Sequence, residues 1–164
     1  MPLLSTLARK KKIEFFLKDI PEDALTLEIG CGSGWVREYL ASTGRTRYLG
    51  VDLAPPAEIV GDIREWKKLG LAAGTFDYII AFEVVEHVDC FEACYELLKP
   101  GGKLLLTSPL PRMDWFLRLL EALHLNQKRT SPHDHLIDFR RIPLFKDRQI
   151  KVVAGLAQWG ILTR

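Results

Sequence analysis

The chain has 164 residues, of which 48% are hydrophobic and 27% charged, a composition typical of one folded globular domain. Its 23 basic and 21 acidic residues leave a formal net charge of +2, which argues against a protein held on nucleic acid by its overall charge. No apolar run reaches the roughly 18 residues of a membrane-spanning helix, and the N-terminal charges follow a short apolar segment, the reverse of a secretory signal. Three cysteines fit a reducing compartment, so we expect a cytoplasmic protein.

Helices and strands are predicted to alternate along the chain. Residues 6–18 form a basic amphipathic stretch that predicts a helix ending before Pro21, and residues 25–30 predict the first strand. The later elements follow in this order: a helix over 35–43, strands over 47–53, 58–63 and 76–84, a helix over 89–98, a strand over 103–109, a helix over 113–125, and two strands within 150–164 separated by Gly155 and Gly160. Apolar strands that alternate with helices predict a parallel sheet covered on both faces.

The segment "LTLEIGCGSGWVREYL" places glycine at every second position where the first strand gives way to a helix, at Gly30, Gly32 and Gly34. Glycine allows the backbone to turn sharply there and to approach a ligand closely. In doubly wound sheets, ligands bind at the carboxyl ends of the strands, which is where this loop lies. A dinucleotide-binding loop reads G-x-G-x-x-G, but Trp35 stands where its third glycine belongs, so a nicotinamide-dependent oxidoreductase is the least favoured alternative.

Carboxylates lie in or after the predicted strands on either side of this loop. Asp52 ends the second strand, about 20 residues after the first glycine, a spacing that suits a carboxylate bound to both hydroxyls of a ribose. Glu28 lies within the first strand, and Asp62 follows the third. These acids, with the aromatic faces of Phe82 and Trp35, suit a ligand that carries positive charge and no phosphate.

Five segments in this order, "LEIGCGSG", "YLGVDLAP", "GDI", "FDYIIAFEVVEHV" and "LLKPGGKLLLTSP", resemble the class I S-adenosylmethionine-dependent methyltransferases, particularly the type 11 group. The resemblance covers about residues 25–109. It implies an α/β, Rossmann-like fold with a seven-stranded, mostly parallel sheet of order 3-2-1-4-5-7-6 and helices on both faces. It also implies a single methyltransferase domain over 1–164, with an N-terminal helix within 1–20 and an acceptor-side insertion over 110–149.

The same resemblance assigns roles in binding S-adenosylmethionine. Glu28 would hold the methionine ammonium, Asp52 the ribose hydroxyls, and Asp62 the adenine amino group. Leu53 would lie against the adenine, and Ile63 would donate its backbone N–H to the ring. The full set of implied cofactor-binding residues is Glu28, Gly30, Cys31, Gly32, Gly34, Asp52, Leu53, Asp62, Ile63 and Phe82.

Methyl transfer is an in-line displacement, in which alignment alone contributes roughly 7–11 kcal/mol, and an acceptor hydroxyl also needs a base. The candidate catalytic residues are Glu86 and His87, with Glu83 beside them after the fourth predicted strand. This E-x-x-E-H pattern with His133 or His135 resembles the metal site of small-RNA 2′-O-methyltransferases and ubiquinone-pathway O-methyltransferases. Helix capping or packing explains the pattern equally well, so a divalent metal stays an alternative that we do not favour.

We therefore expect methyl transfer from S-adenosylmethionine to the oxygen or nitrogen of a small-molecule or lipid-like acceptor. A metal-assisted RNA or quinol O-methyltransferase is one alternative, and residues 128–151, with seven Lys and Arg against three acids, are compatible with a nucleic-acid acceptor. A cofactor-binding partner subunit without catalysis of its own is another, because little sequence beyond the core remains to enclose an acceptor. Neither the acceptor nor an oligomeric state follows from the sequence.

Overall fold

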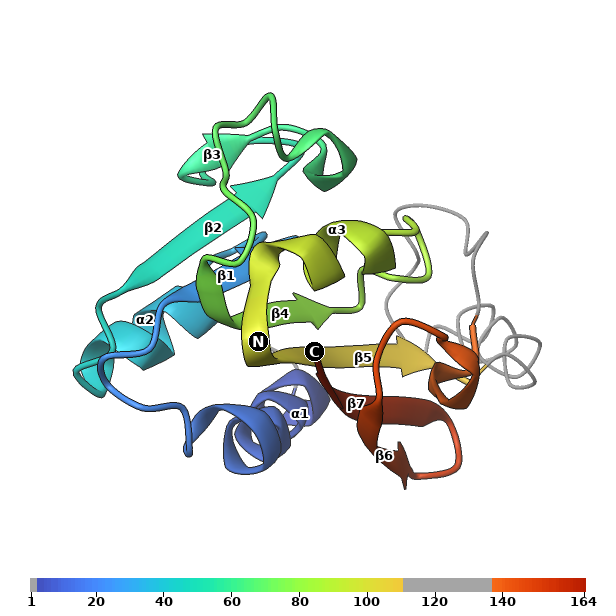
Figure 1. The fold of residues 1–164 in the computed structure, drawn as a ribbon. Helices are drawn as coiled ribbons and strands as arrows, with labels where there is room; N and C mark the ends of the chain where they lie inside the picture. Colours follow the sequence, from blue (N-terminus) through green and yellow to red (C-terminus); the bar gives the residue numbers. More distant parts are fainter. Residues whose placement is uncertain (1–2, 111–136) are drawn as a thin grey trace.

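Seven strands form one sheet of order β3-β2-β1-β4-β5-β7-β6 in the computed structural model, which describes residues 3–110 and 137–164 (Figure 1). The strands are β1 (Thr26–Ile29), β2 (Tyr48–Asp52), β3 (Ile59–Val60), β4 (Phe76–Phe82), β5 (Leu98–Pro109), β6 (Asp147–Val153) and β7 (Ala157–Thr163). The first five pair in parallel, whereas β7 is antiparallel to both β5 and β6. The predicted fold class and strand order are confirmed.

Helices cover both faces of this sheet (Figure 1). One face carries α1 (Leu3–Lys12), the π-helical segment η1 (Ile13–Leu17) and α2 (Trp35–Ser42). The other carries α3 (Phe91–Leu97) and two short 3-10 turns, η2 (Ile63–Glu65) and η4 (Phe139–Arg141).

Alternate residues of the central strand β4 serve the two faces. Ile79 and Ala81 pack in the hydrophobic cluster that includes α3, whereas Ile80 packs with η1 and α2. All three are fully buried. A strand that is buried on both faces needs apolar side chains at successive positions, which explains why "FDYIIAF" has no polar alternation in its centre.

Several element boundaries differ from the prediction. The first helix begins at Leu3 and changes to a π-helical segment at Ile13, instead of running as one α-helix over 6–18. β3 has only two residues, because the Asp62 side chain accepts a hydrogen bond from the backbone N–H of Arg64 and so starts a 3-10 turn. β5 begins directly at the end of α3, upstream of the predicted 103–109, with a register irregularity in its pairing with β4.

The prediction that Gly160 separates the last two strands is wrong. The turn lies at 154–156, where Gly155 has a φ of +68°. Gly160 lies within β7, where it pairs with Leu106 of β5. A Cβ on Gly160 would lie 2.9 Å from Cδ2 of Phe139, which is fully buried. Glycine is therefore present at this position because an aromatic ring of η4 packs directly on the strand.

The segment between β5 and β6 is only partly described. The predicted helix 113–125 and both His133 and His135 lie outside the described residues. After this gap, Phe139, Ile142 and Phe145 are buried in the core that includes α3. Among the residues that the structure describes, no helix has the length and apolar character needed to cross a membrane.

The two margins of the sheet differ in length. β6 forms one margin, and most of its side chains are exposed, among them Asp147, Arg148 and Lys151. β3 forms the opposite margin with two residues only.

Candidate active site

A cavity of about 470 Å³ opens where β1, β2 and β4 end. Its wall contains six of the predicted cofactor residues: Gly30, Asp52, Leu53, Asp62, Ile63 and Phe82. Glu83 and His87 lie in the same wall. The position is the carboxyl edge of the parallel strands, where doubly wound sheets bind their ligands, and the volume lies in the range of small-ligand pockets.

The glycine loop joins β1 to α2. Gly30, Gly32 and Gly34 have φ angles of +71°, +46° and +74°. This left-handed region is costly for residues with a side chain, so glycine lets the loop follow this path without that cost. A Cβ on Gly30 would also lie 2.5 Å from Cγ2 of Val84, so the loop is packed tightly against the segment that follows β4.

Asp52 is fixed to this loop by two backbone hydrogen bonds. The N–H of Gly32 donates to its Oδ2 at 2.9 Å, and the N–H of Leu53 donates to its Oδ1 at 2.7 Å. A carboxylate offers about four lone-pair sites, so both oxygens keep the capacity to accept further donors from a ligand. The end of β2 therefore presents an oriented pair of acceptor oxygens beside the glycine loop.

The far side of the cavity is formed by Asp62 and exposed apolar residues. The Arg64 side chain, hydrogen-bonded to Asp62, holds the pKa of this carboxyl below its usual range. Leu53, which lines the cavity, is 74% exposed. Its side chain leaves an apolar surface in the cavity wall that a flat ring system could cover.

Glu28 lies behind the loop and not in the cavity wall. Its side chain is only 3% exposed and accepts a hydrogen bond from the hydroxyl of Tyr48. Burial raises the pKa of Glu28 to about 8, and the charges of Glu58 and Asp52 act in the same direction. Cys31, the remaining predicted cofactor residue in the loop, is buried as well.

Glu83 is held in an unusual backbone conformation at the end of β4. It has a φ of +56°, a region that residues other than glycine rarely occupy. Its Oε1 accepts hydrogen bonds from Oγ1 of Thr107 at 2.7 Å and from Nζ of Lys12 at 3.1 Å. Partial desolvation opposes ionisation, but the charge of Lys12 and the bond from Thr107 outweigh it and lower the pKa of Glu83. Glu83 is thus an ionised, 47% exposed carboxylate.

Glu86, one of the two predicted catalytic residues, is 1% exposed. Burial, and secondarily the charge of Glu83, raises its pKa to about 8. Its Oε2 has no hydrogen-bond partner among the described residues. The structure therefore separates the acids of the E-x-x-E-H pattern: Glu83 faces the cavity as an anion, and Glu86 is a buried acid that retains its proton at neutral pH.

Two cations of α1 lie against the aromatic residues of the site. Trp35 and Phe82 are stacked with centroids 6.2 Å apart. Arg9 lies 5.4 Å from the Trp35 ring, and Nζ of Lys12 lies 5.1 Å from the Phe82 ring. The sequence patterns assign neither Arg9 nor Lys12 to the site. The one signal that could have singled out these two residues is their i, i+3 spacing, which places them on one helix face.

The described residues alone do not fit a metal centre. Across 3–110 and 137–164, no group of three or more His, Cys, Asp or Glu side chains is arranged to hold a metal ion. The cavity-facing acid Glu83 already accepts a hydrogen bond from the ammonium of Lys12.

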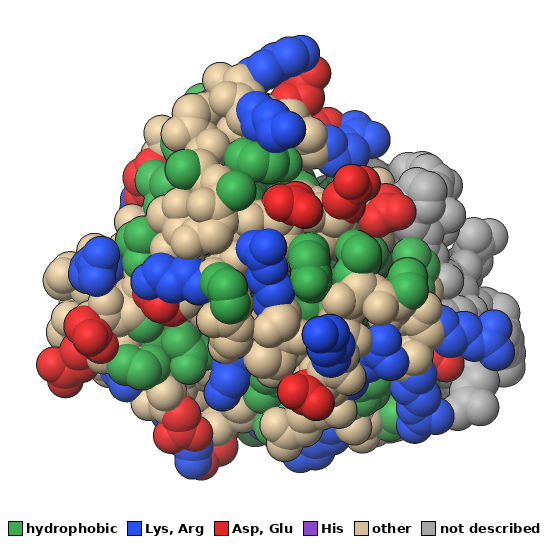
Figure 2. Space-filling model, in the orientation of Figure 1, with side chains coloured by type: hydrophobic (Ala, Val, Ile, Leu, Met, Phe, Trp, Pro, Cys, Tyr) green, Lys and Arg blue, Asp and Glu red, His purple; other side chains and the backbone are tan. Residues whose placement is uncertain are grey.

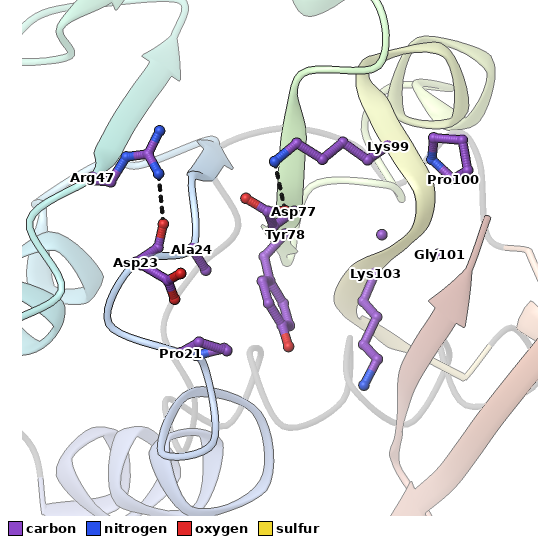
Figure 3. A pocket seen from close by; sticks show the side chains of 11 residues that line it. Pro21, Asp23, Ala24, Arg47, Asp77, Tyr78, Lys99, Pro100, Gly101 and Lys103 are labelled. Carbon is purple, nitrogen blue, oxygen red and sulfur yellow. Dashed lines mark hydrogen bonds and ion pairs between the residues drawn. The ribbon is translucent and has the colours of Figure 1, made fainter.

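A second cavity, of about 350 Å³, lies at the amino ends of β1 and β4, near the start of the 103–109 segment of β5 (Figure 3). Two of its basic side chains have partners within its own wall. Nζ of Lys99 lies 2.7 Å from Asp77, and Arg47 donates to the backbone carbonyl of Asp23 at 2.7 Å. None of the predicted site residues lines this cavity, so the candidate active site is the cavity beside the glycine loop.

The strand order, the glycine loop and the fixed carboxylate after β2 define the class I S-adenosylmethionine-dependent methyltransferase fold. A family model described as a methyltransferase domain matches residues 5–160, and the chain belongs to this family.

Curated relatives and solved structures agree with this family. A ubiquinone biosynthesis O-methyltransferase from Cereibacter sphaeroides is 41% identical over 144 residues, which cover 70% of this chain and 57% of the relative. One from Xanthomonas axonopodis pv. citri is 36% identical over 106 residues, covering 54% and 44%. The chain spans about half the length of these curated relatives.

Two solved structures match over nearly the whole chain. The PH0226 protein from Pyrococcus horikoshii has a TM-score of 0.69 at 18% identity, covering 99% of this chain and 92% of its own. A SAM dependent methyltransferase from Archaeoglobus fulgidus has a TM-score of 0.63 at 17% identity, covering 98% and 93%. At this level of identity, the two structures bear on the fold alone.

Proposed function

We propose that this domain transfers a methyl group from S-adenosylmethionine to an oxygen atom of a small-molecule or lipid-like acceptor. The proposal rests on the position of Asp52, whose carboxylate lies in the cavity wall and accepts hydrogen bonds from the N–H groups of Gly32 and Leu53. Oxygen is favoured over nitrogen because the curated relatives are named ubiquinone biosynthesis O-methyltransferases.

The wall of the cavity suits this cofactor chemically. When bound, S-adenosylmethionine supplies a methyl group on a positively charged sulfur. Asp52 would accept from the ribose hydroxyls, and Asp62 would accept from the adenine amino group beside Leu53. Because Arg64 is paired with Asp62, the attraction for a cationic ligand would come chiefly from the carboxylate of Asp52.

On the acceptor side, Glu83 would act as the base for an acceptor hydroxyl. It faces the cavity as an anion, and the hydrogen bond from Thr107 fixes its position. Its left-handed backbone is a strained conformation of the kind that proteins retain at functional positions. Glu86 is buried and does not line the cavity, so it is less well placed to receive the proton than Glu83, whereas His87 lies in the same wall as Glu83.

Calorimetric titration of the full chain with S-adenosylhomocysteine tests the proposal. The Asp52→Ala variant should bind it roughly tenfold to a hundredfold more weakly, because a charge-assisted pair of hydrogen bonds to the ribose is lost. Asp19→Ala, an exposed acid outside this cavity, should bind like the wild type. Unchanged affinity in Asp52→Ala, or stronger binding of NADH than of S-adenosylhomocysteine by the wild type, would refute it.

A further inference from the structure

The carboxylate of Glu83 already has a cation of its own. Nζ of Lys12 lies 3.1 Å from Oε1 of Glu83, and the lysine side chain is only 14% exposed. The same ammonium lies over the ring of Phe82, 5.1 Å from its centroid. Thr107 donates to the same oxygen of Glu83. Glu83, the cavity-facing acid of the E-x-x-E-H pattern, thus already interacts with one full positive charge and one hydroxyl donor.

The fold fixes the position of this lysine. Lys12 is the last residue of α1, and the chain continues directly into η1, where Phe16 and Leu17 are buried. The ring of Phe16 lies 5.1 Å from that of Phe82, so the helix end and the aromatic residue beneath the ammonium are packed together. Lys12 is therefore held at the site by the core and not by its own side chain alone.

A divalent ion at this position would conflict with the lysine. Ions such as Mg²⁺ and Mn²⁺ bind carboxylate oxygens at about 2.0–2.2 Å, so an ion on Oε1 of Glu83 would lie within about 5 Å of the ammonium. Like charges repel strongly at this separation in a partly desolvated site. The second acid of the pair, Glu86, offers a buried Oε2 without a hydrogen-bond partner in the described part of the chain. Without Lys12, the two acids would offer such an ion carboxylate oxygens, which are the ligands it prefers.

We infer that Lys12 is the resident cation of the Glu83 and Glu86 pair and keeps a divalent ion from binding there. Lys12 is thus a positioning residue that holds the carboxylate of Glu83 in place in the cavity wall. One part of the inference rests on the proposed function, namely that methyl transfer would proceed without a metal ion on these two acids. The occupation of the carboxylate by lysine can be tested independently of that reaction.

The inference can be tested by titrating Mn²⁺ into the purified full chain. The electron paramagnetic resonance signal of free Mn²⁺ measures how much of the ion remains unbound. Lys12→Met keeps the apolar stem on Phe82 and removes the charge. We expect the wild type to bind Mn²⁺ negligibly at this site and Lys12→Met to bind it at least about tenfold more tightly, because the repelling charge is gone. Lys12→Arg, which keeps the charge, should behave like the wild type. Lys11→Met, a change at the exposed neighbouring residue, should do so as well.

The double variant Lys12→Met/Glu86→Gln should lose the gained Mn²⁺ binding, which locates the ion on the acid pair. The inference is overturned if the wild type binds Mn²⁺ in a manner that Glu86→Gln abolishes, or if Lys12→Met gains no Mn²⁺ binding. Calorimetry with S-adenosylhomocysteine on the same samples separates the two claims. If the wild type does not bind S-adenosylhomocysteine, the proposed function is contradicted. The Mn²⁺ result alone decides the role of Lys12.

Discussion

Acids near the glycine loop and the end of β4 differ in protonation because their immediate neighbours differ. The Arg64 side chain keeps Asp62 ionised, and Lys12 together with Thr107 keeps Glu83 ionised. Glu28 has only a neutral hydroxyl as its side-chain donor, so burial dominates and raises its pKa to about 8. Carboxyl groups thus supply both the anions that line the cavity and a neutral buried acid in β1.

The raised pKa of Glu28 predicts a pH-dependent contribution to stability. The proton on Glu28 stabilises the folded state fully below the ordinary pKa of 4.5, and this contribution is lost as the pH rises toward about 8. Each pKa unit corresponds to roughly 1.4 kcal/mol. In Glu28→Gln the amide stays neutral, so the free energy of unfolding of the wild type relative to this variant should fall between about pH 5 and about pH 8.

Urea unfolding followed by tryptophan fluorescence measures this difference. Glu86 also has a pKa raised to about 8, but it is present in both proteins and its effect cancels in the comparison. A difference in unfolding free energy that stays constant across this pH range would show that Glu28 is ionised in the folded protein.

At the scale of elements, features encoded in local sequence patterns could be predicted, whereas contacts between distant residues could not. The glycine loop and the acids at the strand ends could be found because each is encoded in a few consecutive residues. The pairing of Lys12 with Glu83 joins residues 71 positions apart, so no local pattern contains it. Gly160 was misassigned for the same reason. A glycine in a strand pattern also reads as a turn, and only the ring of Phe139 packed on β7 distinguishes the two.

Gly160→Ala should destabilise the fold by about 1–3 kcal/mol, because the new methyl group would overlap the buried ring of Phe139. Chemical denaturation of four proteins forms a double-mutant cycle: the wild type, each single variant, and Gly160→Ala combined with Phe139→Leu. The alanine should cost less in the Phe139→Leu background, where the smaller side chain leaves room. Equal costs in both backgrounds would place the clash elsewhere.

At the scale of the whole molecule, a two-faced core leaves the carboxyl edge of the sheet free for ligands. Leu105 packs with η1 and α2 while its neighbours Leu104 and Leu106 pack toward α3. The acids of the cavity wall, Asp52 and Asp62, lie outside both clusters, so they can occupy that edge without loss of the core. The chain spans about half the length of the curated relatives, so the acceptor has to be found by experiment.

We expect the full chain to methylate a phenolic hydroxyl, with turnover that is insensitive to chelation. A panel of catechols and phenols, with and without a prenyl tail, would be incubated with S-adenosylmethionine and examined by mass spectrometry. Methylated product should form equally well in EDTA and in Mg²⁺, since Lys12 supplies the positive charge beside Glu83. Product that forms only with Mg²⁺ would favour the metal-assisted alternative. S-adenosylhomocysteine binding without any product across the panel would favour a partner subunit.

The margins of the sheet carry a consequence for self-association. A long, flat, apolar outer strand would act as a template on which a second copy could add a strand of its own. Here β3 is too short to offer such a template, and β6 exposes charged side chains along its length. Both ends of the sheet therefore resist the strand-by-strand growth that leads to aggregation.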